Sequence, residues 1–185
     1  AIMEAARSRH GLSSCVRYWE TESRPRSPIF IMDSRGHLAQ APFDSAEGAQ
    51  QGSEYGAKGH NAAYQECFDA VNAFLQPHGG VLRADCDDTV LVAPPSVVGE
   101  AFERLVTAVA ERGGMVQPTK SKAYATTEVK ALMEEEGLSL PNGVQWGTNE
   151  DADGNESFGL VIAGTPVGEP QFILNYVTSK VQDVL

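Results

Sequence analysis

The chain has 185 residues, of which 42% are apolar and 21% are charged, and its 14 Lys and Arg against 25 Asp and Glu give a formal net charge of −11. No apolar run reaches the ~20 residues of a membrane-spanning helix, which argues against a membrane protein, and the length suits one soluble domain with a sizeable core. The acidic balance argues against a free-standing nucleic-acid-binding protein, because such proteins neutralise phosphates with clustered Lys and Arg.

The cysteines and the first residues indicate where the protein resides. Cys15, Cys67 and Cys86 are far apart and form no CxxC pair, and the N-terminus has no apolar signal core. We therefore expect an intracellular protein of the nucleus or cytoplasm that is not secreted.

Charge is unevenly spread along the chain. Residues 1–40 carry six Arg against four acidic residues, a net +2, which leaves −13 for residues 41–185. The first residue is Ala1, and helical spacing of apolar residues begins at once, without a capping residue. We therefore expect a piece of a longer protein.

The first third of the chain predicts helix, hairpin, loop and helix in that order. Helical spacing within residues 1–26 favours two short helices before the prolines at 25 and 28. The β-rich run 27–32 and the turn 33–36 lead into 37–39, which is typical of a hairpin. A Gly-punctuated loop over 47–56 precedes a helix over 57–75.

The central segment predicts a hairpin with an acidic tip. Two short β-prone runs within 80–95 flank the tip, and an amphipathic helix from Ser96 follows, ending at Gly113 and Gly114. Residues 115–118 are short and extended, and Lys120 follows them.

The last third begins with an acidic stretch, 126–157, which we expect to be a flexible, solvated insertion. Asp151 opens a sequence similar to an EF-hand loop, but Glu156 stands where that loop needs Gly and Ile162 where it needs Glu, so a solvated loop is the default. A strand and turn over 158–168 and a helix towards residue 185 complete the chain.

The acidic tip is the main candidate for chemistry. Asp85, Asp87 and Asp88 lie within four positions, and carboxylates so close repel one another unless solvent or a cation offsets the charge. Carboxylates suit Mg²⁺, whereas turns favour Asp for its own hydrogen bonding. Composition alone leaves both readings open.

The order of these features resembles the palm of reverse transcriptases of the non-LTR retrotransposon type. In that family a loop of the form QG-x-x-x-G lies by the template and incoming nucleotide, and here it corresponds to Gln51, Gly52 and Gly56. The Asp-Asp pair on a hairpin corresponds to Asp87 and Asp88, so the resemblance makes both of them metal ligands and catalytic residues, with Asp87 the main ligand.

Two further segments extend the resemblance over nearly the whole chain. A helix, a glycine, a short strand and a Lys match the residues up to Lys120, which the resemblance makes a catalytic residue that neutralises or protonates the leaving pyrophosphate. Residues 159–168 are similar to the segment near the primer grip, which carries over Gly164 and Gly168. Residues 126–157 match the family pattern least.

The implied fold is α+β: an incomplete, ferredoxin- or RRM-like antiparallel sheet with the Asp-Asp hairpin at its centre, backed by the helices near 57–75 and 96–112. The implied organisation is a partial palm over 1–125, the acidic insertion over 126–157, and a primer-grip-like strand with the start of a C-terminal helix over 158–185.

The sequence departs from the family pattern in ways that bear on activity. Asp85 stands where an aromatic residue usually precedes the Asp pair, and residues 53–55 replace the usual Asp-Pro-Leu. The first catalytic carboxylate and the fingers of such polymerases would lie before Ala1. Because two-metal catalysis needs carboxylates from two strands, we expect this chain alone not to polymerise.

The resemblance implies that the parent protein synthesises DNA on an RNA or DNA template-primer from dNTPs, using Mg²⁺ or Mn²⁺. This acidic fragment alone is expected to bind nucleic acid weakly. One alternative is a domesticated or decayed palm remnant that at most binds a partner. Another is an unrelated acidic binding module whose Asp tip holds a cation.

Overall fold

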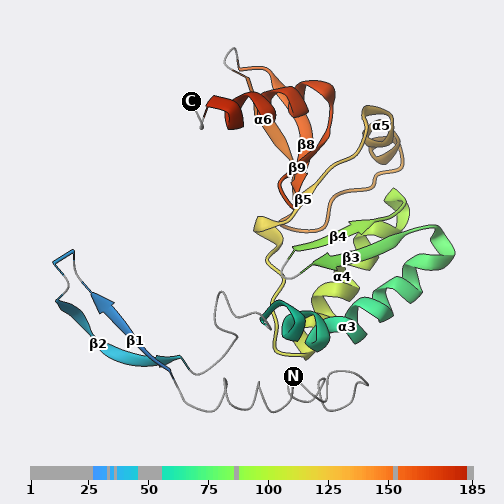
Figure 1. The fold of residues 1–185 in the computed structure, drawn as a ribbon. Helices are drawn as coiled ribbons and strands as arrows, with labels where there is room; N and C mark the ends of the chain where they lie inside the picture. Colours follow the sequence, from blue (N-terminus) through green and yellow to red (C-terminus); the bar gives the residue numbers. More distant parts are fainter. Residues whose placement is uncertain are drawn as a thin grey trace. The chain divides into compact units, whose positions relative to one another are not determined.

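A computed structural model describes residues 27–32, 34, 35, 37–45, 56–85, 88–151 and 154–182 (Figure 1). The chain divides after Gln65 into two compact units. Within the described residues, helices combine with small, mostly antiparallel sheets, so the expected α+β class is confirmed. The two helices predicted within residues 1–26 lie outside the described residues. Within the described part of the chain, no helix is long and apolar enough to cross a membrane.

The first unit contains the predicted N-terminal hairpin. Strand β1 (Ser27–Met32) pairs antiparallel with β2 (Leu38–Ser45), and the pairing shifts register on both sides of Ile31. Helix α3 (Gly56–Leu75) begins in this unit and ends in the second. The first strand and the helix agree with the expected ranges, whereas the second strand continues six residues beyond the expected 37–39.

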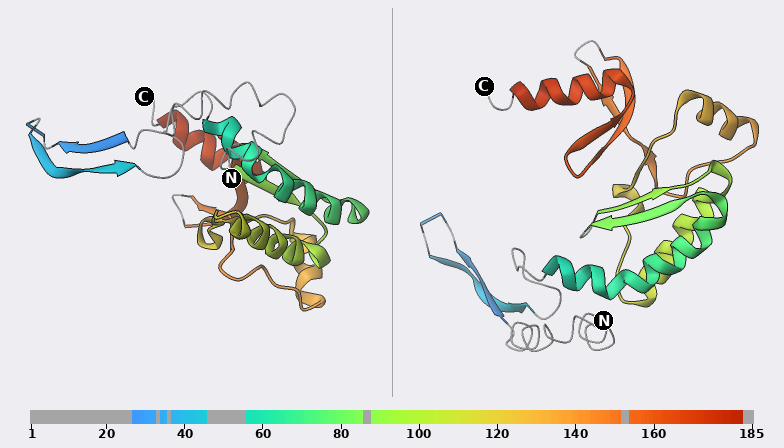
Figure 2. Two further views of the ribbon diagram at one scale, coloured as in Figure 1. Left: turned by 90° about the horizontal axis from the view of Figure 1, so that it is seen from below. Right: turned by 45° about the vertical axis from the view of Figure 1, so that its right-hand side comes forward.

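The second unit opens with the predicted central hairpin and its two helices. Helix α3 is followed by a short 3-10 helix, η2 (Gln76–His78). Strand β3 (Val81–Asp85) then pairs antiparallel with β4 (Asp88–Val92). Helix α4 (Pro95–Glu111) follows. Figure 1 and the right view of Figure 2 show α3 and α4 on the same side of this hairpin.

Local sequence explains both ends of α4. Pro95 occupies the first helical position, where a missing N–H has no consequence. Gly113 adopts φ +78° after the helix, and Gly114 donates its N–H to the carbonyl of Val109 at 3.0 Å, which satisfies one of the last helical carbonyls. The two glycines therefore end the helix as predicted.

The α3–α4 layer has a compact apolar core in the second unit. Its buried side chains are Cys67, Phe68, Val71, Leu75, Leu82, Ala101, Leu105 and Val109. The Cys67 thiol donates to the carbonyl of Ala108 at 3.2 Å, and burial raises the pKa of that thiol. On the surface, the Arg104 guanidinium lies 4.3 Å from the Phe74 ring centroid and so links the two helices.

The segment expected to be a solvated insertion contains structure that we did not predict. After η3 (Pro118–Lys120), strand β5 (Lys122–Ala123) pairs in parallel with β6 (Gln145–Trp146). Between them lies α5 (Thr127–Glu135), whose first turn is capped by the Thr126 hydroxyl. Met133 of α5 is buried, whereas the run of glutamates at 134–136 is exposed.

The C-terminal part is a small sheet covered by one helix. Strand β8 (Glu156–Ile162) pairs antiparallel with β7 (Thr148–Glu150) on one side and β9 (Thr165–Gly168) on the other. Helix α6 (Pro170–Gln182) then packs on this sheet through the buried Phe172. The strand, turn and helix expected from residue 158 onwards are therefore present.

A row of glycines lets α6 approach the sheet closely. Gly159 of β8 stands opposite Gly168 of β9, and it donates its N–H to the carbonyl of Gly147 at 3.0 Å. A Cβ on Gly159 would overlap the Phe172 ring, and a Cβ on Gly147 or Gly168 would overlap the β8 backbone. Gly159 is therefore required where the Phe172 ring packs on strand backbone, and Gly147 and Gly168 are required where their own backbones approach β8 closely.

Candidate functional site

The β3–β4 hairpin brings two carboxylates face to face. Asp85, the last residue of β3, stands directly opposite Asp88, the first residue of β4. The Cβ atoms of directly opposed residues lie about 4.5–5.5 Å apart, and like charges in that position are destabilising. Both side chains are exposed, so solvent or a cation can offset their charge.

The two carboxylates lie on the face of the hairpin that the helices leave open. Side chains alternate between faces along a strand, so Asp85 shares its face with Arg83 and Val81, and across the pairing with Asp88 and Val92. Val92 is 59% exposed, whereas Leu82, on the opposite face, is 1% exposed. The covered face therefore supports the hairpin, and the acidic face meets solvent.

Asn72 of α3 fixes the position of the hairpin. Its side-chain amide accepts a hydrogen bond from the backbone N–H of Leu82 at 2.7 Å and donates one to the carbonyl of the same residue at 3.1 Å. One side chain thus satisfies both backbone groups that a neighbouring strand would otherwise pair. This contact sets β3, and with it the acidic pair, against α3.

Two exposed carboxylates suit a hard cation such as Mg²⁺, which prefers oxygen ligands and retains several waters. Asp85 and Asp88 provide such oxygens at the end of the hairpin. Over the described residues, no group of three His, Cys, Asp or Glu side chains gathers as a metal site. Asp87, the main ligand expected from the sequence, lies outside those residues, as does Cys86.

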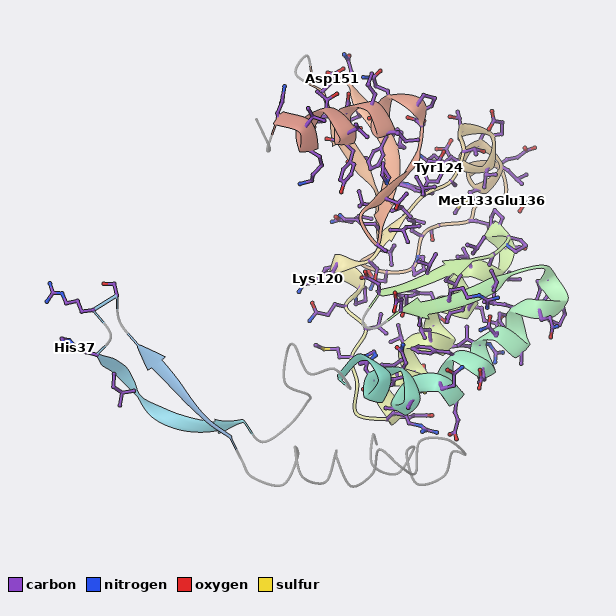
Figure 3. The ribbon with its side chains drawn as sticks, viewed as in Figure 1. His37, Lys120, Tyr124, Met133, Glu136 and Asp151 are labelled. Atoms are coloured by element: carbon purple, nitrogen blue, oxygen red, sulfur yellow. The ribbon has the colours of Figure 1, made fainter. Side chains whose placement is uncertain are left out.

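Lys120 lies in η3 and is exposed. In Figure 1 and in the right view of Figure 2, η3 lies on the side of the hairpin at which β3 and β4 are joined, and Figure 3 labels Lys120 there. The described geometry places this ammonium on the same side as the acidic end of the hairpin. It shows no contact that would assign a role to Lys120.

The remaining predicted site residues are not gathered around this hairpin by any described contact. Gln51 and Gly52 lie outside the described residues, and Gly56 is the first residue of α3. Gly164 adopts φ +80° in the two-residue turn between β8 and β9, and Gly168 pairs with Gly159. The turn and the strand pairing of the C-terminal sheet therefore explain why glycine occupies positions 164 and 168.

Asp151, which opens the EF-hand-like sequence, closes the loop between β7 and β8. Its carboxylate accepts the backbone N–H of Asn155 at 2.9 Å and also the side-chain amide of that residue. Gly154 provides φ +81° within this loop. Hydrogen bonds that close the loop therefore account for the presence of Asp151 and Asn155.

A half-buried lysine is the feature that sequence reasoning missed. The Lys130 ammonium of α5 lies 3.1 Å from the ring centroid of Phe158 and 4.7 Å from that of Trp146. Burial lowers the pKa of Lys130, and the carboxylates of Glu169 and Glu156 oppose that shift. The aromatic residues are far from Lys130 in sequence, so no local pattern indicates the contact. It attaches α5 to the C-terminal sheet.

The chain was also compared with known proteins. No family model, no curated protein and no solved structure matches it. Evidence for function therefore comes from the residues and geometry described above.

Proposed function

We propose that this chain is part of the palm of a reverse transcriptase of the non-LTR retrotransposon type, and that its parent protein carries out template-directed DNA synthesis. The observation that carries this proposal is that Asp88, one of the two aspartates of the family motif, lies exposed at the end of a hairpin backed by two helices. The order α3, β3, β4, α4 and then Lys120 supports it. An activity on nucleic acid fits a nuclear or cytoplasmic protein.

The residues of the hairpin fit the cation that the proposal requires. Asp85, Asp87 and Asp88 would hold Mg²⁺ or Mn²⁺, which when bound supplies Lewis-acid activation of the attacking oxygen and stabilisation of the leaving pyrophosphate. The chain's own contribution is to present the Asp85 and Asp88 carboxylates at the exposed end of a hairpin that Asn72 contacts at Leu82. Lys120 would add a positive charge for the pyrophosphate, with dNTPs and a template-primer as the other partners.

Primer extension by the complete parent protein tests the proposal. We expect Asp87→Asn to abolish synthesis, because it removes one negatively charged oxygen ligand, and Glu103→Gln to leave it unchanged, because Glu103 is an exposed residue of α4. Undiminished synthesis by Asp87→Asn would exclude this site. No synthesis by the wild-type parent protein would instead favour the non-catalytic remnant.

Cation binding can be tested separately on this chain. Mn²⁺ broadens the NMR signals of nearby residues, so titration should broaden the amides of β3 and β4 near Asp85 and Asp88 before those elsewhere. Asp88→Asn should weaken the effect. Equal broadening at the exposed glutamates of 134–136 would mean that the hairpin has no selective site.

A further inference from the structure

The turn that leads into β6 contains the only Asn-Gly pair of the chain. Val144 donates its N–H to the carbonyl of Pro141 at 3.0 Å, which makes Asn142 and Gly143 the two central residues of a β-turn. Gly143 adopts φ +83°, as the second central residue of a type II turn does, and a Cβ there would lie 3.0 Å from Cβ of Pro118. The turn and this close approach both favour glycine after the asparagine.

The same pair leaves the Asn142 side chain open to reaction with the backbone. Asn142 and Gly143 are both exposed, and in the part of the chain that the structure describes neither the Asn142 side-chain amide nor the Gly143 N–H makes a hydrogen bond. Glycine has no side chain that shields its nitrogen. The Gly143 nitrogen can therefore reach the side-chain carbonyl carbon of Asn142 once the turn opens by rotation about the bond between them.

The other five asparagines of the chain lack this combination. Each is followed by Ala, Glu or Tyr, whose side chain crowds the next backbone nitrogen. Asn72 is also held by the backbone of Leu82, and the Asn155 side-chain amide donates to the Asp151 carboxylate at 3.0 Å. Both the sequence and the surroundings thus single out Asn142.

We propose that Asn142 is a site of spontaneous deamidation. The Gly143 nitrogen bonds to Cγ of Asn142, the bond from Cγ to the amide nitrogen breaks, and ammonia leaves with the proton of the Gly143 N–H. Water then opens the resulting succinimide at either of its carbonyls, which gives aspartate or isoaspartate. Either product makes the formal net charge of −11 one unit more negative. This inference does not depend on the proposed function.

Isoaspartate would change the turn itself, because the backbone then runs through the side-chain carbons and is longer by one methylene group. The turn lies between two structured segments. Gly143 lies close to Pro118 of η3, and Gln145, the first residue of β6, donates its N–H to the carbonyl of Ser121 at 3.4 Å. We therefore expect the NMR amide signal of Gln145 to shift in the isoaspartate form.

Mass spectrometry of the full chain tests the proposal. Cleavage after glutamate releases residues 137–150, a peptide that contains both Asn142 and Asn149. After incubation of the folded chain in mildly alkaline buffer, we expect the mass gain of amide-to-acid conversion at Asn142, in two isomeric peptides, while Asn149 keeps its amide as the internal control. Mildly acidic buffer should slow the reaction, because the attacking nitrogen must lose its proton.

A variant and a reference peptide complete the test. Asn142→Gln keeps the side-chain amide but would have to close a larger ring, so it should give neither product. A synthetic peptide of residues 137–150 gives the reference rate, since it has no fixed turn. If Asn142 of the folded chain keeps its amide over a period in which this peptide converts fully, the proposal is wrong. Equal conversion of Asn142 and Asn149, or formation of aspartate without isoaspartate, would overturn it as well.

Discussion

The contact between Asn72 and Leu82 makes the most direct test of how the hairpin is held. Asn72→Ala removes hydrogen bonds of 2.7 and 3.1 Å from the backbone of Leu82, a residue that is 1% exposed. The Leu82 N–H loses its Asn72 partner, whereas the Leu82 carbonyl still accepts from the Arg83 guanidinium at 3.1 Å. A buried group left unsatisfied costs about 1–3 kcal/mol, and alanine regains about 0.5 kcal/mol of helix propensity. We therefore expect the free energy of unfolding to fall by about 0.5–2.5 kcal/mol, the spread reflecting how far water replaces the lost partner.

Urea unfolding followed by circular dichroism gives this free energy, and NMR hydrogen exchange reports on the Leu82 amide itself. Asn142→Ala is the matched control, since Asn142 is an exposed loop residue, and its effect should stay within about 0.5 kcal/mol. If Asn72→Ala changes the unfolding free energy by no more than this control and the Leu82 amide keeps its protection, α3 does not hold the hairpin by this contact.

Three further predictions concern the C-terminal sheet and its contacts. Gly159→Ala should lower the free energy of urea unfolding by about 2–3 kcal/mol, because the new methyl group overlaps the Phe172 ring, and a Phe172→Ala background should remove most of that effect. Ala163 has φ +47°, a left-handed conformation that strains a residue with a Cβ, so Ala163→Gly should stabilise the protein by about 0.5–1 kcal/mol and raise its melting temperature. An unchanged or lower melting temperature would show that this backbone is not strained. Lys130→Met replaces the ammonium, which contacts two rings, with an apolar group of similar length, and urea unfolding of this variant and of the wild type is compared over a range of pH. The pKa of Lys130 is lowered in the folded state, so the unfolding free energy of the wild type should rise as the pH increases from that pKa towards the ordinary pKa of lysine. The variant should lack this rise. Equal pH profiles of the two proteins would refute the burial of the Lys130 charge.

Local patterns predicted the elements that have strong local signals. The β-rich run at 27–32 with its turn, the runs around the acidic tip, and the apolar spacing of Ala101, Leu105 and Val109 each define an element within a few residues. Two glycines marked the end of α4 because a left-handed residue ends a helix there. Such signals need no knowledge of distant contacts.

Other features depend on distant residues and escaped prediction. Helix α5 lies in an acidic segment that has the composition of a solvated loop, yet Met133 and the ring contacts of Lys130 hold it. Strands β5 and β6 pair across 23 positions with two residues each, too short for an alternating pattern. Asp85 and Asp88 stand directly opposite each other because two positions separate the strands, and this spacing can be read from the sequence.

The glycine row has a consequence for how related copies of this sequence would diverge. Gly159 and Gly168 fall in the segment that resembles the primer-grip region, but contact with the Phe172 ring and the β8 backbone is enough to retain them. A descendant that had lost catalysis would keep these glycines for as long as it folded. The side chains of Asp85 and Asp88, in contrast, are exposed. On the proposed function, loss of the carboxylates beside retained glycines would indicate a copy that folds without catalysis, whereas retention of both would indicate selection for the proposed chemistry.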